Sequence, residues 1–204
     1  MRNYLILFAA LVISATLVIT PEANHEKQGI SNPTCKHPGH VHSTKNPDDF
    51  ISFNPNEKVI LIGLDDVAQS EILKAKNILR NFFRCTIEIK ENINLEDHLY
   101  YDISKTIIDP DKFVRNYTPE YKTVYITNKS MYAQGTYCRG YTTLKGDVAI
   151  VATGSFLGET LVHEMGHTYG LLHCEDLACV MAIYNDQYDK GTFCEKCRDK
   201  IGYY

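Results

Sequence analysis

The sequence has no cluster of basic residues, no internal repeat and no low-complexity tract. Among its 204 residues, 21 lysines and arginines stand against 25 aspartates and glutamates, and the formal net charge is −4. Proteins that bind nucleic acid draw much of their affinity from basic side chains that neutralise phosphates. The charge distribution therefore argues against a nucleic-acid partner.

No apolar run in the sequence reaches the length of a transmembrane helix. The apolar segment Tyr4–Ile19 follows Met1 and Arg2 and contains no charged residue. It is shorter than the roughly 20 residues of a transmembrane helix and has the length of a secretory signal core. We expect residues 1–20 to be a signal peptide and the protein to be secreted or periplasmic. An uncleaved N-terminal anchor is the alternative, because no clean small-residue cleavage site follows, and only then would the protein be membrane-bound.

The segment after this leader has few apolar residues. Residues 21–56 are rich in proline, asparagine, histidine and lysine, and we expect a linker. A cysteine and three histidines lie close together in it, for which a polar linker is the simpler interpretation and a metal-binding or inhibitory segment the alternative. These residues are Cys35, His37, His40 and His42. Residues 57–204 have the size of one compact domain, which we expect to be a monomer.

The apolar pattern of residues 57–204 predicts an α/β (α+β) fold. A continuous apolar run at Val59–Leu64 predicts a buried strand, and helical spacing from Val67 to Phe83 predicts a helix packed on a sheet. Asp65 or Asp66 is the expected cap of this helix. Further strands are expected at Cys85–Ile89, Lys122–Thr127 and Asp147–Val151, whereas Glu91–Tyr121 carries no assignable pattern.

An exposed edge of the sheet is predicted shortly before Ser155. Met131–Leu144 contains several tyrosines, threonines and glycines, which suits an edge strand or a wide hairpin. Ser155 is the expected N-cap of the helix that follows, and Glu159 lies favourably near the positive end of that helix.

This helix carries the sequence H-E-M-G-H-T-Y-G-L-L-H, from His163 to His173. His163 and His167 are four residues apart, so both imidazoles project from one helix face and can bind one metal ion. His173 can join them only if the backbone turns, and Gly170 allows the left-handed conformation that ends a helix. The pattern therefore predicts a site with three histidine ligands.

Three imidazoles leave the fourth tetrahedral position of a zinc ion open for water, which is typical of a catalytic zinc. Zinc lowers the pKa of that water to about 7. Glu164 is expected to act as general base on the zinc-bound water and then as proton donor to the leaving amine. The motif predicts a zinc-dependent metallopeptidase that hydrolyses peptide bonds. The alternative is a catalytically silent, zinc-stabilised binding module, although such a module does not need the glutamate.

The run H-E-x-x-H-x-x-G-x-x-H resembles the zinc motif of the metzincins, and the continuation C-x4-C-x-M followed by C-x-x-C is similar to the archaemetzincin family. The resemblance implies a metzincin-like fold: a twisted mixed sheet with a backing helix, a zinc-binding active-site helix and a small C-terminal subdomain. It implies a methionine turn below the histidines, for which Met181 is the matching residue. It also implies an edge strand, within Gly135–Thr143, that pairs with a peptide or protein substrate. Tyr184 is a candidate to stabilise the oxyanion, as a phenol does in some zinc peptidases.

The same resemblance implies a second, structural zinc on four cysteines: Cys174, Cys179, Cys194 and Cys197. The chain would then hold two zinc ions. Four thiolates make a closed tetrahedral site, which would tie the C-terminal subdomain to the loop of His173. Two disulfides are the alternative, because export leads to an oxidising compartment. The chain departs from the family pattern in its export and in a shorter spacer before Cys194.

Seven cysteines are present in all. If four of them bind zinc, Cys35, Cys85 and Cys138 remain. One disulfide plus one free thiol is then the simplest allocation.

Overall fold

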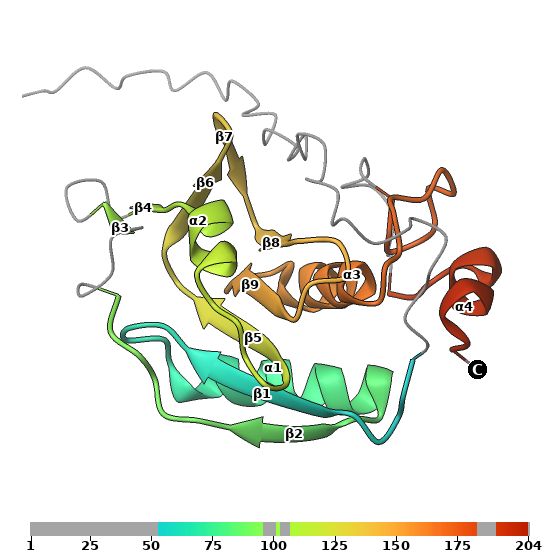
Figure 1. Ribbon diagram of the computed structural model, residues 1–204, viewed down its shortest axis with the longest axis horizontal. Helices are drawn as coiled ribbons and strands as arrows, with labels where there is room; N and C mark the ends of the chain where they lie inside the picture. The colour runs from blue at the N-terminus through green and yellow to red at the C-terminus, as the bar shows by residue number, and fades with distance from the viewer. Residues whose placement is uncertain (1–52, 96–100, 103–106, 183–190, 204) are drawn as a thin grey trace, which may run out of the picture. The chain divides into compact units, whose positions relative to one another are not determined.

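The computed structural model describes residues 53–95, 101–102, 107–182 and 191–203 (Figure 1). The expected signal peptide at residues 1–20 and the linker up to residue 52 lie outside these ranges. So do Tyr184 and the cluster of Cys35, His37, His40 and His42. No helix in the described part has the length and apolar character needed to cross a membrane.

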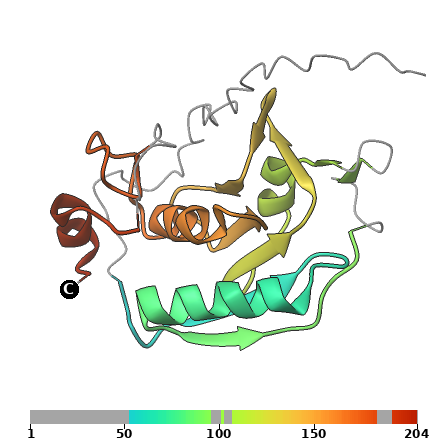
Figure 2. The same ribbon diagram turned by 180° about the vertical axis from the view of Figure 1, so that it is seen from behind.

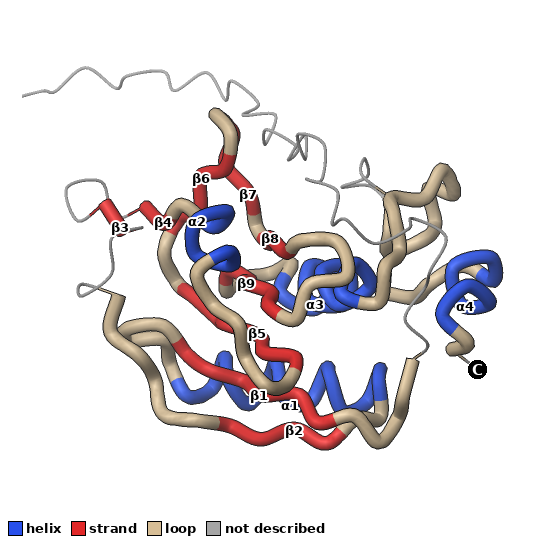
Figure 3. Tube along the Cα trace, in the orientation of Figure 1, coloured by secondary structure: helices blue, strands red, loops and turns tan. Residues whose placement is uncertain are grey.

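A five-stranded sheet with the strand order β2-β1-β5-β9-β8 lies at the centre of the described residues (Figure 3). Strands β2, β1, β5 and β9 are parallel, and β8 runs antiparallel to β9 at one edge. Their bounds are Lys58–Gly63 for β1, Thr86–Ile89 for β2, Lys122–Thr127 for β5, Gly140–Thr142 for β8 and Val148–Ala152 for β9. Inner parallel strands read as continuous apolar runs because both faces are covered. The four predicted strands of this sheet, β1, β2, β5 and β9, are confirmed to within one residue at each end.

Two helices cover one face of this sheet, α1 (Gln69–Phe83) and α3 (Leu157–Thr168) (Figures 1 and 2). Alternate strand residues such as Leu61 and Val124 belong to the same buried cluster as the inner face of α1 and the apolar residues of α3. The intervening strand residues, such as Tyr125, face a second cluster on the other side of the sheet. The predicted helix and its packing on a sheet are therefore confirmed.

The expected capping of α1 is wrong. Its N-cap is Ala68, which makes no side-chain hydrogen bond to the helix. Asp65 Oδ1 accepts a hydrogen bond from the backbone nitrogen of Leu95 at 2.7 Å, and Asp66 Oδ1 accepts one from Asn128 at 3.0 Å. Both carboxylates bond to residues far away in the sequence, so the local capping pattern could not reveal their partners.

The expected capping of α3 is also wrong. The N-cap is Phe156 rather than Ser155, and it makes no side-chain cap hydrogen bond. Gly154 has a φ of +126°, and its carbonyl oxygen accepts a hydrogen bond from the backbone nitrogen of Leu157 at 3.2 Å. The chain therefore enters the helix through a glycine turn and not through a serine cap. Glu159 lies in the first turn of α3, as predicted.

A second, four-stranded sheet has the order β3-β4-β6-β7, and its buried residues Ile108 and Met131 belong to the cluster on the face of the main sheet opposite α1 and α3. The segment without an assignable pattern contributes β3 (Tyr101–Asp102), β4 (Ile107–Ile108) and the short helix α2 (Pro110–Arg115). In Met131–Leu144, where an edge strand or a wide hairpin is expected, β6 (Ser130–Ala133) and β7 (Thr136–Cys138) form a hairpin that is tight and not wide. Its two turn residues, Gln134 and Gly135, both have positive φ, as a tight hairpin turn requires.

The C-terminal segment contains α4 (Glu195–Ile201) and packs on α1 through aromatic rings. Tyr203 stacks on Phe82 with ring centroids 5.5 Å apart, and Phe193 meets the same ring edge-on at 5.4 Å. The Tyr203 hydroxyl donates a hydrogen bond to the carbonyl oxygen of Phe82. These contacts hold the small C-terminal subdomain against the backing helix.

Replacing Leu79 with alanine is expected to destabilise the fold. Leu79 is fully buried between α1 and the sheet, so its removal leaves a cavity and should lower the free energy of unfolding by about 2–5 kcal/mol. Urea unfolding followed by circular dichroism measures the change. Leu73 of the same helix is 46% exposed, and Leu73→Ala should change stability by less than about 0.5 kcal/mol. Equal effects of the two variants would contradict the packing described.

Candidate active site and metal centres

The three motif histidines converge at the end of α3. Their side-chain nitrogens lie within 4.8 Å of one another, and the ring centroids are separated by 4.6 to 5.3 Å. Gly170 has a φ of +93°, in the left-handed region, and turns the chain so that His173 comes back toward the helix. The geometry predicted from the spacing is therefore present, with His163 and His167 on one helix face.

Backbone carbonyls determine which nitrogen of each helical imidazole carries the proton. His163 Nδ1 lies 2.8 Å from the carbonyl oxygen of Val180, and His167 Nδ1 lies 2.6 Å from that of Leu171. A carbonyl oxygen only accepts hydrogen bonds, so each Nδ1 must be the donor. In the neutral rings both Nε2 atoms then present lone pairs, and these atoms are 3.0 Å apart. Two facing lone pairs repel unless a cation lies against both, so this donor set fits a metal ion.

Glu164 is buried beside these histidines, with 1% of its surface exposed. A side chain at Gly140 of β8 would place its Cβ 2.6 Å from Glu164 Cγ and Oε1 and from Thr160 Cγ2. Only a glycine allows the edge strand to pass this close to the helix. The expected edge strand within residues 135–143 therefore contains β8, which lies directly against the predicted general base.

Met181 lies below the same helix. It is fully buried, and a Cβ at Gly166 would be 2.4 Å from its sulfur. The backbone around it forms a turn, in which the nitrogen of Ala182 donates to the carbonyl oxygen of Cys179 at 3.0 Å. The same turn supplies the Val180 carbonyl that holds His163. The methionine turn implied by the resemblance is thus present and bonded to one of the histidines.

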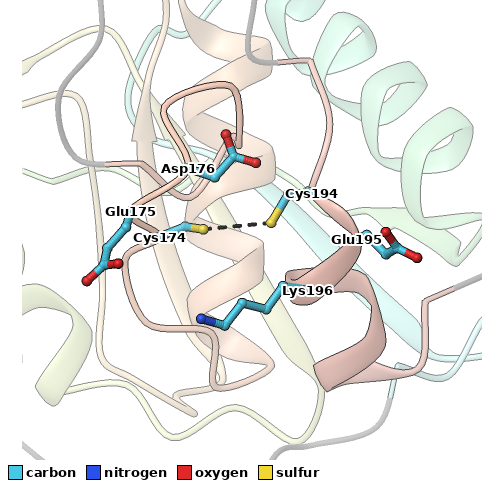
Figure 4. Close-up of a pocket in the computed structure, with 6 residues that line it drawn as sticks. All are labelled: Cys174, Glu175, Asp176, Cys194, Glu195 and Lys196. Carbon is cyan, nitrogen blue, oxygen red and sulfur yellow. Dashed lines mark hydrogen bonds between the residues drawn. The ribbon is translucent and has the colours of Figure 1, made fainter.

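The four C-terminal cysteines form a second cluster, with all four sulfur atoms within 4.8 Å of one another. Cys174 Sγ lies 3.7 Å from Cys194 Sγ, too far for a disulfide bond (Figure 4). The nitrogen of Cys194 donates to Cys179 Sγ at 3.3 Å. This convergence of four thiols is the donor set of a closed tetrahedral zinc site, and none of the four forms a disulfide bond.

The Cys179 and Cys197 side chains are joined by a hydrogen bond. This bond from the Cys197 thiol lowers the pKa of Cys179 to about 5 and raises the pKa of Cys197, with burial adding to the rise. A metal ion bound by the cluster would take the place of the remaining thiol protons.

Cys85 and Cys138 belong to buried clusters on opposite faces of the main sheet. They form no disulfide with each other. Burial raises the pKa of the Cys85 thiol to about 11, so it stays protonated at neutral pH. A pairing of either residue with Cys35 lies outside the described part of the chain.

The structure adds a buried lysine that the sequence pattern does not single out. Lys122 is 4% exposed and reaches the C-terminal end of α3, where its Nζ lies 3.5 Å from the carbonyl oxygen of Thr168. Its ammonium also lies 3.3 Å from a carboxylate oxygen of Asp147 and 5.1 Å from the centre of the Tyr169 ring. A single lysine at the start of a predicted strand does not indicate from sequence that it will be buried against the end of a helix.

A mixed α/β fold with three converging histidines, a buried glutamate and a methionine turn defines the class of metzincin-like zinc peptidases. The model of peptidase family M54 matches residues 156–202. An archaemetzincin of Archaeoglobus fulgidus is 30% identical over 119 residues, covering 50% of this chain and 74% of that protein. An archaemetzincin of Methanopyrus kandleri is 27% identical over 134 residues, covering 55% and 75% of the two chains.

The crystal structure of the Archaeoglobus fulgidus archaemetzincin, complexed with malonate, superposes with a TM-score of 0.63 at 25% identity. The match covers 71% of this chain and 99% of that one. The chain belongs to the archaemetzincin family, and it is a zinc metallopeptidase.

Replacing Gly166 with alanine is expected to push Met181 away from α3. The new Cβ would lie 2.4 Å from the methionine sulfur, so the turn that holds His163 must shift. Because Met181 is fully buried and a ring carbon of Phe193 lies 3.1 Å from the same Cβ position, the displaced side chain has little room, and we expect the turn to move with it. We therefore expect weaker zinc binding, measured by competition with a chromophoric chelator, and a lower melting temperature. Gly158 of the same helix has only Ile78 Cδ1 near its Cβ position, at 3.5 Å. Gly158→Ala should leave zinc binding unchanged and stabilise the helix by up to about 1 kcal/mol. Unchanged zinc binding in Gly166→Ala would contradict the coupling.

Proposed function

We propose that the chain hydrolyses peptide bonds with Glu164 as the general base, at a zinc ion held by His163, His167 and His173. The observation that carries this proposal is the pair of Nε2 atoms 3.0 Å apart whose rings are both fixed by backbone carbonyls. A buried carboxylate on the same helix supplies the base. When bound, zinc would polarise the scissile carbonyl and lower the pKa of water to about 7.

The protein's own groups would then act as follows. The Glu164 carboxylate removes a proton from the attacking water and returns it to the leaving amine, which departs as a neutral group. Its burial keeps competing water away and strengthens its interaction with the developing charge. The imidazoles need no proton transfer, because their Nδ1–H groups stay bonded to the carbonyls of Leu171 and Val180.

Strand β8 is the proposed platform for the substrate backbone. It is an edge of the main sheet and passes beside Glu164 at Gly140. Tyr141, the next residue of β8, bonds the strand to α2, because its hydroxyl donates a hydrogen bond to Asp111 at 2.6 Å. A peptide that pairs with this edge would be held by main-chain hydrogen bonds, with its scissile carbonyl near the base.

The second zinc ion is proposed at Cys174, Cys179, Cys194 and Cys197. Four sulfur atoms within 4.8 Å of one another support this proposal against two disulfides. The site would join the loop after His173 to α4, so its metal would stabilise the active site without contacting substrate.

Residues 1–20 are proposed to direct export to a secreted or periplasmic location, with a membrane anchor as the alternative. The described residues are proposed to act as a monomer on a peptide or protein substrate.

Replacing Glu164 with glutamine is expected to abolish hydrolysis while zinc stays bound. Loss of a general base lowers kcat by roughly 100- to 10,000-fold, and the amide keeps the size of the side chain. Cleavage of a quenched fluorescent casein and zinc content by emission spectroscopy measure the two effects. The control is Glu88→Gln on β2, at the opposite edge of the main sheet, which should keep full activity. Unchanged hydrolysis by Glu164→Gln would refute the assignment, and an inactive parent protein with full zinc content would favour the silent binding module.

Replacing Cys197 with serine is expected to remove one of two zinc ions per chain. A serine hydroxyl stays protonated at neutral pH and does not replace a thiolate, so the melting temperature should fall as well. Metal analysis measures the zinc content, thermal unfolding measures the melting temperature, and a thiol count on the unfolded parent protein tests for disulfides. Cys85→Ala, at a buried thiol outside the cluster, should retain both ions. If the parent protein holds one zinc and none of the four thiols reacts, disulfides form instead.

A further inference from the structure

A small pocket of about 140 Å³ opens at the beginning of α3, beside β8. It has room for roughly four water molecules at about 30 Å³ each, so it suits one short side chain and not a whole ligand. Its walls contain one cation and three hydroxyl side chains, and none of the lining residues is a carboxylate. The lining residues are Arg139, Ala152, Thr153, Gly154, Ser155, Phe156, Leu157 and Thr160.

The pocket adjoins the proposed catalytic carboxylate. Thr160 lines it, and Glu164 lies one helical turn further along α3. A Cβ at Gly140 would be 2.6 Å from atoms of both residues, so β8 crosses the helix between them. Arg139 is the residue directly before Gly140. A substrate held on β8 beside Glu164 therefore has the pocket within one residue of its reacting bond.

Two of the contacts of Arg139 hold it beside the pocket. Its carbonyl oxygen accepts a hydrogen bond from the backbone nitrogen of Ala152 at 2.7 Å, which fixes the main chain to β9. Its guanidinium carbon lies 3.9 Å from the centre of the Phe156 ring, so the planar group rests on the aromatic face. A carboxylate approaches a guanidinium along its edge, in the plane of the N–H groups. Stacking on Phe156 and binding of a carboxylate are therefore compatible.

The direction of β8 determines which substrate residue reaches this pocket. Antiparallel pairing is two to three times as common as parallel pairing. A peptide antiparallel to β8 passes Thr142 first, then Gly140, and then Arg139. With the scissile bond at Glu164, the residues on the C-terminal side of that bond lie at the pocket.

We propose that Arg139 makes this pocket a specificity site for an aspartate or glutamate at the first or second position after the cleaved bond. The handful of atoms in an acidic side chain matches the volume, the guanidinium supplies the charge, and the hydroxyls of Thr153, Ser155 and Thr160 supply further hydrogen-bond donors. This inference rests on the proposed peptidase activity.

The test uses the zinc-loaded full chain and quenched fluorescent peptides of one sequence, with Glu or Gln at each position around the cleaved bond. We expect kcat/KM for a Glu peptide to exceed that for its Gln partner by about tenfold or more, at one of the first two positions after the bond. In Arg139→Met the Glu peptide should lose about ten- to hundredfold, and the Gln peptide should change less than about twofold. Arg139→Lys should keep part of the preference, and Arg139→Glu should shift it toward a lysine peptide. Arg80→Met, at an exposed arginine of α1, should change neither rate.

A binding measurement separates the pocket from the chemistry. Zinc-loaded Glu164→Gln protein should bind the Glu peptide about tenfold or more tightly than the Gln peptide by fluorescence anisotropy, and Arg139→Met added to it should remove the difference. Equal rates and equal affinities for Glu and Gln peptides would overturn the proposal, as would an acidic preference before the cleaved bond. Equal losses for both peptides in Arg139→Met would assign Arg139 a structural role only. If no peptide is cleaved but the binding preference is present, the proposed peptidase activity fails and the proposed pocket for acidic side chains stands.

Discussion

The hydrogen bond from His163 Nδ1 to the carbonyl oxygen of Val180 connects the helix of the histidines to the methionine turn. It sets the tautomer of the ring, and it fixes the ring to a chain segment 17 residues further on. That segment is the methionine turn, whose backbone also binds the loop after the third histidine, because Cys174 N donates to the Met181 carbonyl at 2.9 Å. Helix, turn and loop can therefore adopt the observed arrangement only together. Two of the four clustered cysteines, Cys174 and Cys179, belong to this loop and turn. A metal ion bound there would therefore restrain the histidines through the backbone.

The parts of the structure that can be predicted are those whose signal is local or chemically specific. The buried strand Lys122–Thr127 has the predicted bounds, because a short run rich in threonine, valine, tyrosine and isoleucine is a strand signal. The convergence of three histidines follows from the helical period and one left-handed glycine. The clustering of four cysteines is predicted by the resemblance to archaemetzincins and by the preference of zinc for thiolates.

The parts that could not be predicted depend on contacts between distant residues. Asp65 and Asp66 look like helix caps, but their carboxylates bond to Leu95 and to Asn128, which are 30 and 62 residues away. The short elements β3, β4 and α2 have too few residues to show a period. Gly140 is an ordinary glycine in the sequence, and its importance appears only when β8 is seen to cross α3 between Thr160 and Glu164.

The proposed zinc helix is held at its C-terminal end by a buried charge, which completes the restraint on the histidines. Lys122 places its ammonium near the Thr168 carbonyl, where the helix dipole is negative, and Asp147 compensates the charge at the surface. Tyr169, the C-cap residue, donates its hydroxyl hydrogen bond to Glu57 at 2.6 Å, and burial, together with this bond, keeps the pKa of its phenol well above the usual range. Lys122 begins β5 and Glu57 immediately precedes β1, so the end of the helix is bonded to two strands of the main sheet. His167 lies one residue before Thr168, so these bonds to the sheet restrain the helix backbone beside this histidine, while the Leu171 carbonyl orients its ring.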